Sequence, residues 1–188
     1  PFDLFNPDMK HGVHLYCKRV FIMENCRELV PEYFRFIRGV VDAPDLNLNI
    51  SREILQQDRL VRNIRRNLVK KIFGHLETME SETYATFWNQ FGQVLKSGIY
   101  TDPENRKKIA DLARYRTTRT EDKLISFKEY VDRMQPDQKE IYYLTGDDLT
   151  ALIDSPLLER LKEKGYEVLL MSDPVDEWVV QALDQYEG

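Results

Sequence analysis

The sequence contains little cysteine and no long apolar run. Cys17 and Cys26 are its only thiols, so a disulfide scaffold is excluded and a reduced, cytoplasmic setting is expected. No stretch approaches the roughly 18 consecutive apolar residues of a membrane span, and no basic start followed by an apolar run marks a signal peptide. We therefore expect a soluble protein.

Several sequence motifs of enzymes and metal sites are also missing. Neither glycine-rich phosphate-binding pattern occurs, so we do not expect the chain to bind a nucleotide alone. There is no G-x-S-x-G nucleophile turn for a hydrolase. His11, His14, Cys17 and Cys26 lie close in sequence, but strand alternation would separate His14 from His11 and Cys17. With no C-x-x-C pair, we expect no metal site.

The composition is that of a globular protein with a core. Hydrophobic residues make up 42% of the 188 residues, enough for one large domain or two small ones. Acidic residues outnumber basic ones by 32 to 27, which excludes a global attraction to nucleic acid. Because the chain opens with Pro1 and stops at Gly188 after a helical pattern, we expect it to be a piece of a longer protein.

The pattern of apolar residues predicts strands at both ends and helices between. Near the N-terminus we expect a long strand over 12–23, a helix over 27–36 and a strand over 37–41. In the middle third we expect helices over 58–79 and 82–96, one from Asp102 and one capped by Ser126 with Glu129. The last third predicts strands at 141–145 and 167–171, with helices after Asp147, Ser155 and Asp173. The fold class is therefore α/β, with two small α/β layers joined by a helical coil.

One predicted helix is strongly basic. Its cations are Arg59, Arg62, Arg65, Arg66, Lys70 and Lys71. Most such runs are solvated helix faces. The alternative is a stand-alone binding module that uses this helix to engage a polyanion or an acidic partner.

A second candidate is an arginine at a helix start. Ser51 can cap a helix, which places Arg52 in the first turn, where unpaired N–H groups make the potential positive. Glu53 can neutralise this arginine. The alternative is that Arg52 awaits a phosphate, with Gln56 one turn further on.

Trp178 is the third candidate. In the final helix it lies beside the stripe formed by Val175, Val179 and Leu183. A core role is the commoner fate of a tryptophan. We expect instead a half-exposed ring that contacts a protein partner.

Long segments of the chain resemble one chaperone family. They are PFDLF, VFIMENCRELVPEYFRFIRGVVDAPDLNLNISREILQQ, RNIRRNLVKKI, YVDRM, KEIYYLTG, SPLLERLKEKGYEVLLMSDPVDEW and the closing YEG. Together they resemble, in register from Pro1 to Gly188, the middle segment of the 90-kilodalton heat-shock protein family, most closely its bacterial form.

The resemblance implies a homodimeric, ATP-driven chaperone of which this chain is the second of three parts. It implies three regions: 1–57, part of an incomplete first αβα unit with the catalytic loop; 58–135, a helical spacer; and 136–188, a terminal βαβα unit. The implied partners are the parent's own N-terminal nucleotide-binding module, its C-terminal dimerisation module, and unfolded or partly folded client proteins. No nucleic acid or membrane partner is implied.

The resemblance also implies roles for individual residues. Arg52 would contact the terminal phosphate of ATP bound by the preceding module, Gln56 would belong to the same catalytic loop, and Phe21 would help to dock it. Client proteins would contact Glu177, Trp178 and Gln181. ATP and Mg²⁺ would be cofactors of the parent, whereas this chain alone would have none and would not be an enzyme.

Overall fold

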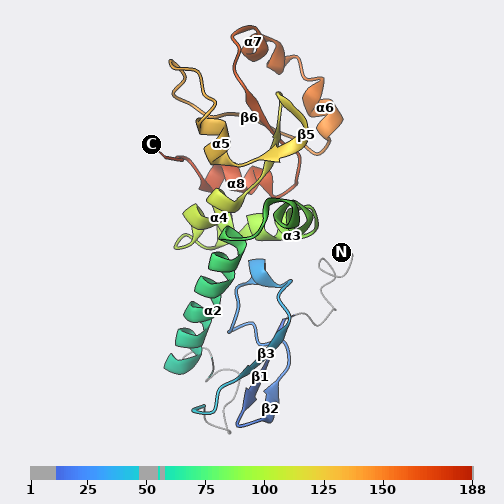
Figure 1. The fold of residues 1–188 in the computed structure, drawn as a ribbon. Coiled ribbons are helices and arrows are strands. Elements are labelled where there is room, and N and C mark those ends of the chain that lie inside the picture. Colours follow the sequence, from blue (N-terminus) through green and yellow to red (C-terminus); the bar gives the residue numbers. More distant parts are fainter. Residues whose placement is uncertain (1–11, 47–54, 56–57, 188) are drawn as a thin grey trace. The chain divides into compact units, whose positions relative to one another are not determined.

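The computed structural model describes residues 12–46, 55 and 58–187, apart from the side chains of 121 and 122. The chain divides into two compact units, Pro1–Tyr84 and Ala85–Gly188. Each contains one small mixed sheet with helices (Figure 1). The predicted α/β fold class is therefore confirmed, while the three regions 1–57, 58–135 and 136–188 stay a prediction. None of the described helices has the length and apolar character needed to cross a bilayer.

The sheet of the first unit has the strand order β2-β1-β3. β1 (Val13–Cys17) pairs antiparallel with β2 (Val20–Met23) and parallel with β3 (Gly39–Asp42). The single strand predicted over 12–23 was wrong, because Lys18 and Arg19 both adopt positive φ angles, 50° and 66°. Two such residues form the tight turn that joins antiparallel strands into a hairpin.

The helices of the first unit are one short 3₁₀ turn and one long α-helix. The helix predicted over 27–36 shrinks to η2 (Glu32–Phe34), since a proline at 31 cannot donate the backbone hydrogen bond of a helix interior. The predicted helix over 58–79 is confirmed as α2 (Arg59–Glu77), capped by Asp58, whose Oδ1 accepts from the Leu60 and Val61 amides. Phe73 of α2 packs against the Phe34 ring, with centroids 5.0 Å apart.

In the second unit, a four-stranded sheet has the order β5-β4-β7-β6. β4 (Tyr115–Thr117) pairs antiparallel with β5 (Thr120–Ile125) and with β7 (Val168–Met171), while β6 (Tyr142–Thr145) runs parallel to β7. The expectation of a wholly helical middle third was therefore wrong. The β4–β5 hairpin pairs with β7, a strand of the predicted terminal βαβα unit.

Helices cover both faces of this second sheet (Figure 1). Val168 and Leu170 of β7 pack with Leu152 of α6 (Leu149–Ile153) and Leu158 of α7 (Leu157–Glu163). Leu169 and Met171 point to the opposite face, where they line a cavity of about 450 Å³ with residues of α5 (Phe127–Val131) and α8 (Asp176–Ala182). The alternation of a buried strand thus gives the unit two apolar layers.

Two further helices differ from the sequence prediction in extent. α3 spans Ser81–Thr101 and so continues past the predicted end at residue 96. The next helix, α4, spans Arg106–Leu112 and begins after Asn105, later than the expected start at Asp102. The capping box of α5 is confirmed, since Ser126 Oγ accepts from the Glu129 amide and Glu129 Oε2 accepts from the Ser126 amide.

Candidate functional site

Two aromatic side chains form an exposed contact in the second unit. Trp178 on α8 is 51% exposed and Tyr100 at the end of α3 is also 51% exposed. Their ring centroids lie 5.3 Å apart with the planes inclined by 47°. We call Tyr100 and Trp178 the aromatic pair. The predicted partial exposure of Trp178 is confirmed, whereas its contact with Tyr100 was not foreseen.

A buried ionic contact holds α8 against α3. Lys96 is 2% exposed, and its Nζ lies 2.6 Å from Asp176 Oδ1 and 2.5 Å from Asp173 Oδ2. Asp176, only 1% exposed, also accepts a hydrogen bond from the Asp173 amide at 3.0 Å. The same ammonium lies 4.8 Å from the ring centroid of Tyr115. Acidic residues in the first turn of a helix are usually exposed to solvent, whereas Asp176 is buried here.

Burial dominates the electrostatics around this contact. It raises the pKa of Asp176 above its usual value even though Lys96 acts in the opposite direction. It also raises the pKa of Tyr115 well above 10, and the nearby Asp176 and Asp173 carboxylates add to that rise. The Tyr115 hydroxyl has no hydrogen-bond partner in the described part of the chain. The buried Lys96 ammonium therefore balances the charge of the Asp173 and Asp176 carboxylates.

The other predicted client-contact residues lie on the same helix as Trp178. Glu177 and Gln181 are exposed and stand four residues apart, on one face of α8. Val179 is fully buried and anchors the opposite side of the helix. The helix thus presents Glu177, Trp178 and Gln181 outward together.

The structure describes only some of the residues expected to act on ATP. Arg52 and Gln56 lie outside the described residues. Leu55, between them, is fully buried. Phe21 on β2 is 54% exposed, and its ring meets the edge of Tyr16 at 5.6 Å between centroids. An aromatic surface is therefore available at Phe21.

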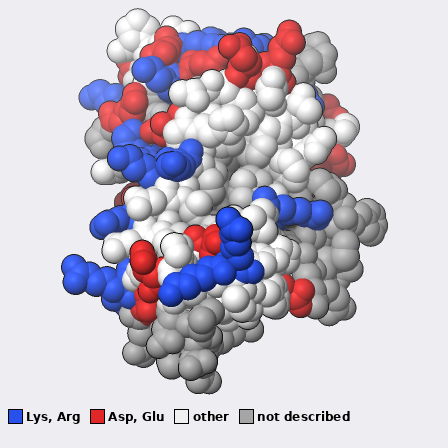
Figure 2. Space-filling view, turned by 60° about the horizontal axis from the view of Figure 1, so that its bottom comes forward, with Lys and Arg blue, Asp and Glu red and all other residues white. Residues whose placement is uncertain are grey.

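The basic residues of α2 are mostly solvated. Five of the six are exposed, namely Arg59, Arg62, Arg66, Lys70 and Lys71. Arg65 is partly buried and donates from Nη1 to the backbone carbonyls of Arg27 and Glu28, at 3.2 and 3.3 Å. On the face of the molecule in Figure 2, basic and acidic side chains are interspersed among uncharged ones. This distribution fits a solvated helix better than a dedicated polyanion surface.

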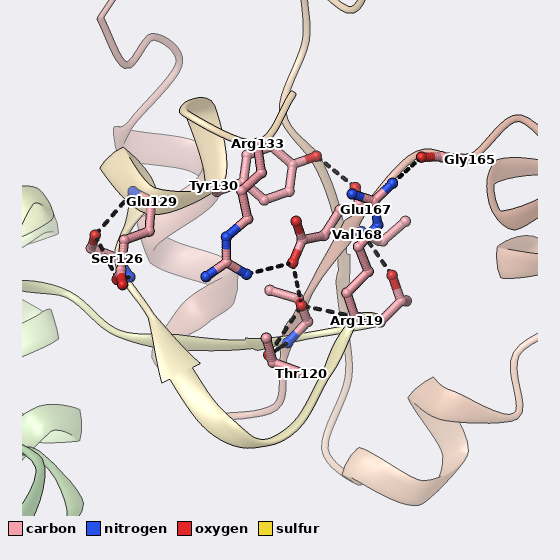
Figure 3. A network of polar contacts seen from close by, with 11 residues as sticks. Arg119, Thr120, Ser126, Glu129, Tyr130, Arg133, Gly165, Glu167 and Val168 are labelled. Carbon is pink, nitrogen blue, oxygen red and sulfur yellow. Dashed lines mark hydrogen bonds and ion pairs between the residues drawn. The ribbon is translucent and has the colours of Figure 1, made fainter. Parts of the chain in front are cut away.

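A polar network joins β4, β7 and the end of α5 (Figure 3). Glu167, 3% exposed, accepts at Oε1 from Thr117 Oγ1 at 2.6 Å and pairs with Arg133 Nη1 at 3.6 Å. The Tyr130 hydroxyl donates to the Glu167 carbonyl at 2.6 Å and accepts from the Tyr142 amide at 3.0 Å. These contacts hold β4, β7 and α5 together, and α8 follows β7 in the chain.

Of the four candidate metal ligands, the two cysteines take other partners, and His11 lies outside the described residues. The Cys17 thiol donates to the Leu46 carbonyl at 3.0 Å, and the Cys26 thiol donates to Glu28 at 3.5 Å. Burial, with a smaller contribution from Glu28, raises the pKa of Cys26 to about 11. Among the described residues no group of three or more His, Cys, Asp or Glu could hold a metal ion.

Comparison with known proteins places the chain in one family. The family described as Hsp90 protein matches residues 1–188, and the chain belongs to it. It is 52% identical to chaperone protein HtpG of Geobacter metallireducens and 50% identical to that of Bdellovibrio bacteriovorus. Each match covers the whole chain and 30% of the relative.

A solved structure narrows the assignment to one part of the family's proteins. The middle domain of a Plasmodium falciparum heat shock protein matches with a TM-score of 0.84 at 32% identity, over all of this chain and 74% of that one. The chain is therefore an Hsp90-family middle domain of the bacterial HtpG type.

Proposed function

We propose that this chain is the part of an ATP-driven chaperone that completes the ATPase site through Arg52 and offers a client-binding surface centred on Trp178. The client-binding surface is supported by one observation above all: a tryptophan that is half exposed on a helix anchored by a buried ion pair. Tryptophan is enriched at interface hot spots, where a large ring gains most from desolvation.

The ATPase role is supported by the family and by the chemistry of the residue. The sequence predicts Arg52 in the first turn of a helix, where an arginine adds positive charge to an already positive end and favours an incoming anion. Its planar guanidinium can bind two phosphate oxygens and offset charge that develops on the transferred group. Gln56 lies four residues after Arg52 in the sequence, and Phe21 is exposed, as docking of the loop would require.

The ATPase role is tested in the full-length chaperone with Arg52→Ala. Arginines that contact the transferred phosphate contribute roughly 10³ to 10⁵ in rate in other systems, so turnover should fall severely while circular dichroism is unchanged. Arg62→Ala, at an exposed position of α2, is the matched control and should keep normal turnover. Normal turnover in Arg52→Ala would refute the assignment.

The 188-residue chain alone should neither hydrolyse ATP nor bind it tightly. It has no glycine-rich phosphate cradle, and one arginine cannot hold a triphosphate with Mg²⁺. Calorimetric titration with ATP and Mg²⁺ measures this directly. Saturable micromolar binding would show that the chain carries a nucleotide site of its own.

The client-binding role is tested with Trp178→Ser and a permanently unfolded probe, reduced and carboxymethylated α-lactalbumin. Because the ring is half exposed, its loss should weaken probe binding and leave the melting temperature nearly unchanged. Ile153→Ser, which alters another exposed apolar side chain, is the control. A large fall in the melting temperature with Trp178→Ser would instead indicate a core role.

A further inference from the structure

The aromatic pair combines two helices that are distant in sequence. Tyr100 lies in the last turn of α3 and Trp178 in the first half of α8. Each of the two residues is 51% exposed even though their rings are in contact. Together they form a continuous apolar surface that neither helix provides alone.

A buried ion pair joins the same two helices as the aromatic pair. Lys96 precedes Tyr100 by four residues on α3, so the two side chains lie on the same face of the helix. Asp176, the partner of Lys96, precedes Trp178 by two residues on α8. The ionic contact and the ring contact thus both join α3 to α8. A surface that is ordered before binding loses less conformational entropy when a partner arrives.

The charge around the aromatic pair is negative. Glu177 is exposed beside Trp178, and the Asp173 side chain is 40% exposed. The Lys96 ammonium is buried between two carboxylates and offers no charge to solvent. Arg106, near the end of α3, keeps its positive charge while its Nε donates to the Ile99 carbonyl at 2.9 Å, so the three carboxylates of Asp173, Asp176 and Glu177 outnumber the two cations, Lys96 and Arg106, by one. A partner that carries positive charge would therefore be favoured here.

We propose that Tyr100 is a second client-contact residue, and that the aromatic pair binds extended segments of non-native polypeptide in which an apolar or aromatic side chain stands beside Lys or Arg. This inference rests on the proposed client-binding role of Trp178. The apolar side chain packs on the two rings, and the neighbouring cation contacts a ring face or the Glu177 carboxylate.

The test measures how single substitutions change the affinity of the protein for a synthetic peptide in which a Phe-Leu pair is flanked by lysines. Binding is measured by fluorescence anisotropy at low salt. Tyr100→Ser should weaken binding by about fivefold or more, as for a hot-spot residue worth over about 1 kcal/mol. Tyr143→Ser is the matched control, because Tyr143 is another exposed tyrosine of the same unit, at 48%. It should change binding by less than about twofold, the effect of a near-neutral contact.

The charge preference is tested with the same peptide carrying glutamates in place of lysines. The lysine peptide should bind about fivefold more tightly, a difference of roughly 1 kcal/mol. Glu177→Gln should narrow that difference, and high salt should reduce it. Equal affinity for both peptides would overturn the proposed chemistry of the partner.

The outcomes separate this inference from the proposed function. If Trp178→Ser abolishes binding and Tyr100→Ser does not, the client site stands and Tyr100 is not part of it. If Trp178→Ser binds normally, the proposed client site itself is wrong. Melting temperatures identify any misfolded variant. If Tyr100→Ser melts early, Tyr100→Gln replaces it, because Gln keeps an aliphatic stem but no ring.

Discussion

The Tyr130 hydroxyl occupies the end of the β6–β7 ladder, and its removal should destabilise the second unit. It donates to the Glu167 carbonyl at 2.6 Å and accepts from the Tyr142 amide and from Gln138 Nε2, both at 3.0 Å. Tyr130→Phe keeps the ring, 1% exposed, but removes all three hydrogen bonds. Each buried group that loses its partner costs about 1 to 3 kcal/mol. Gln138 Nε2 keeps its bond to the Glu140 carbonyl, so two groups lose their partner and we expect a loss of about 2 to 6 kcal/mol.

For a unit of this size, each kcal/mol lowers the melting temperature by roughly 4 to 8 °C, so a fall of about 10 °C or more is expected. Differential scanning calorimetry measures the fall, with Tyr143→Phe as the control because that hydroxyl belongs to an exposed side chain. Hydrogen exchange should also speed up at the Tyr142 amide. A shift no larger than that of Tyr143→Phe would refute the reasoning.

Three further predictions concern backbone space, charge and thiol reactivity. Gly74→Ala should stabilise α2 by up to about 1 kcal/mol in urea unfolding, since nothing lies within 4 Å of the added Cβ. Gly92→Ala should instead lower the free energy of unfolding, because its Cβ would meet the Trp88 ring at 2.6 Å. Glu129→Ala should cost about 1 kcal/mol at pH 7. Burial acts to raise the pKa of Glu129, but hydrogen bonds from its capping partner outweigh burial and lower it. The stability cost of Glu129→Ala should therefore disappear as the pH falls below about 4.3 through that lowered pKa. A stability difference that persists in acid would contradict this. Native Cys26, with a pKa of about 11, should react with iodoacetamide at pH 8 about a hundredfold more slowly than in urea, and equal rates would show an accessible thiolate.

The elements that could be predicted from sequence carry their own local signals. α2 has a cap at Asp58 and apolar residues at helical spacing, and α5 has a complete capping box. Such signals act within one or two turns, so no distant residue can override them easily. The exposure of Trp178 could be predicted for a similar reason, from its place at the border of an apolar stripe.

The parts that could not be predicted depend on unusual turns or on distant partners. The hairpin at Lys18 and Arg19 adopts positive φ angles without glycine or asparagine, so the chain gives no turn signal there. Tyr100 and Lys96 lie in a helix whose pattern does not show which face meets α8. The partner of Lys96 is Asp176, 80 residues away, and only the folded chain brings them together.

The buried Lys96–Asp176 contact also restricts how this sequence can change over generations. Loss of Lys96 leaves the buried Asp176 carboxylate without its cation, which costs about 3 to 5 kcal/mol, whereas an apolar pair of similar volume can be as stable or more so. The route between these two solutions passes through single substitutions that would endanger folding. The two codons, far apart in the gene, are thus tied to one another, and a homologue that departs from lysine at 96 should also depart from aspartate at 176.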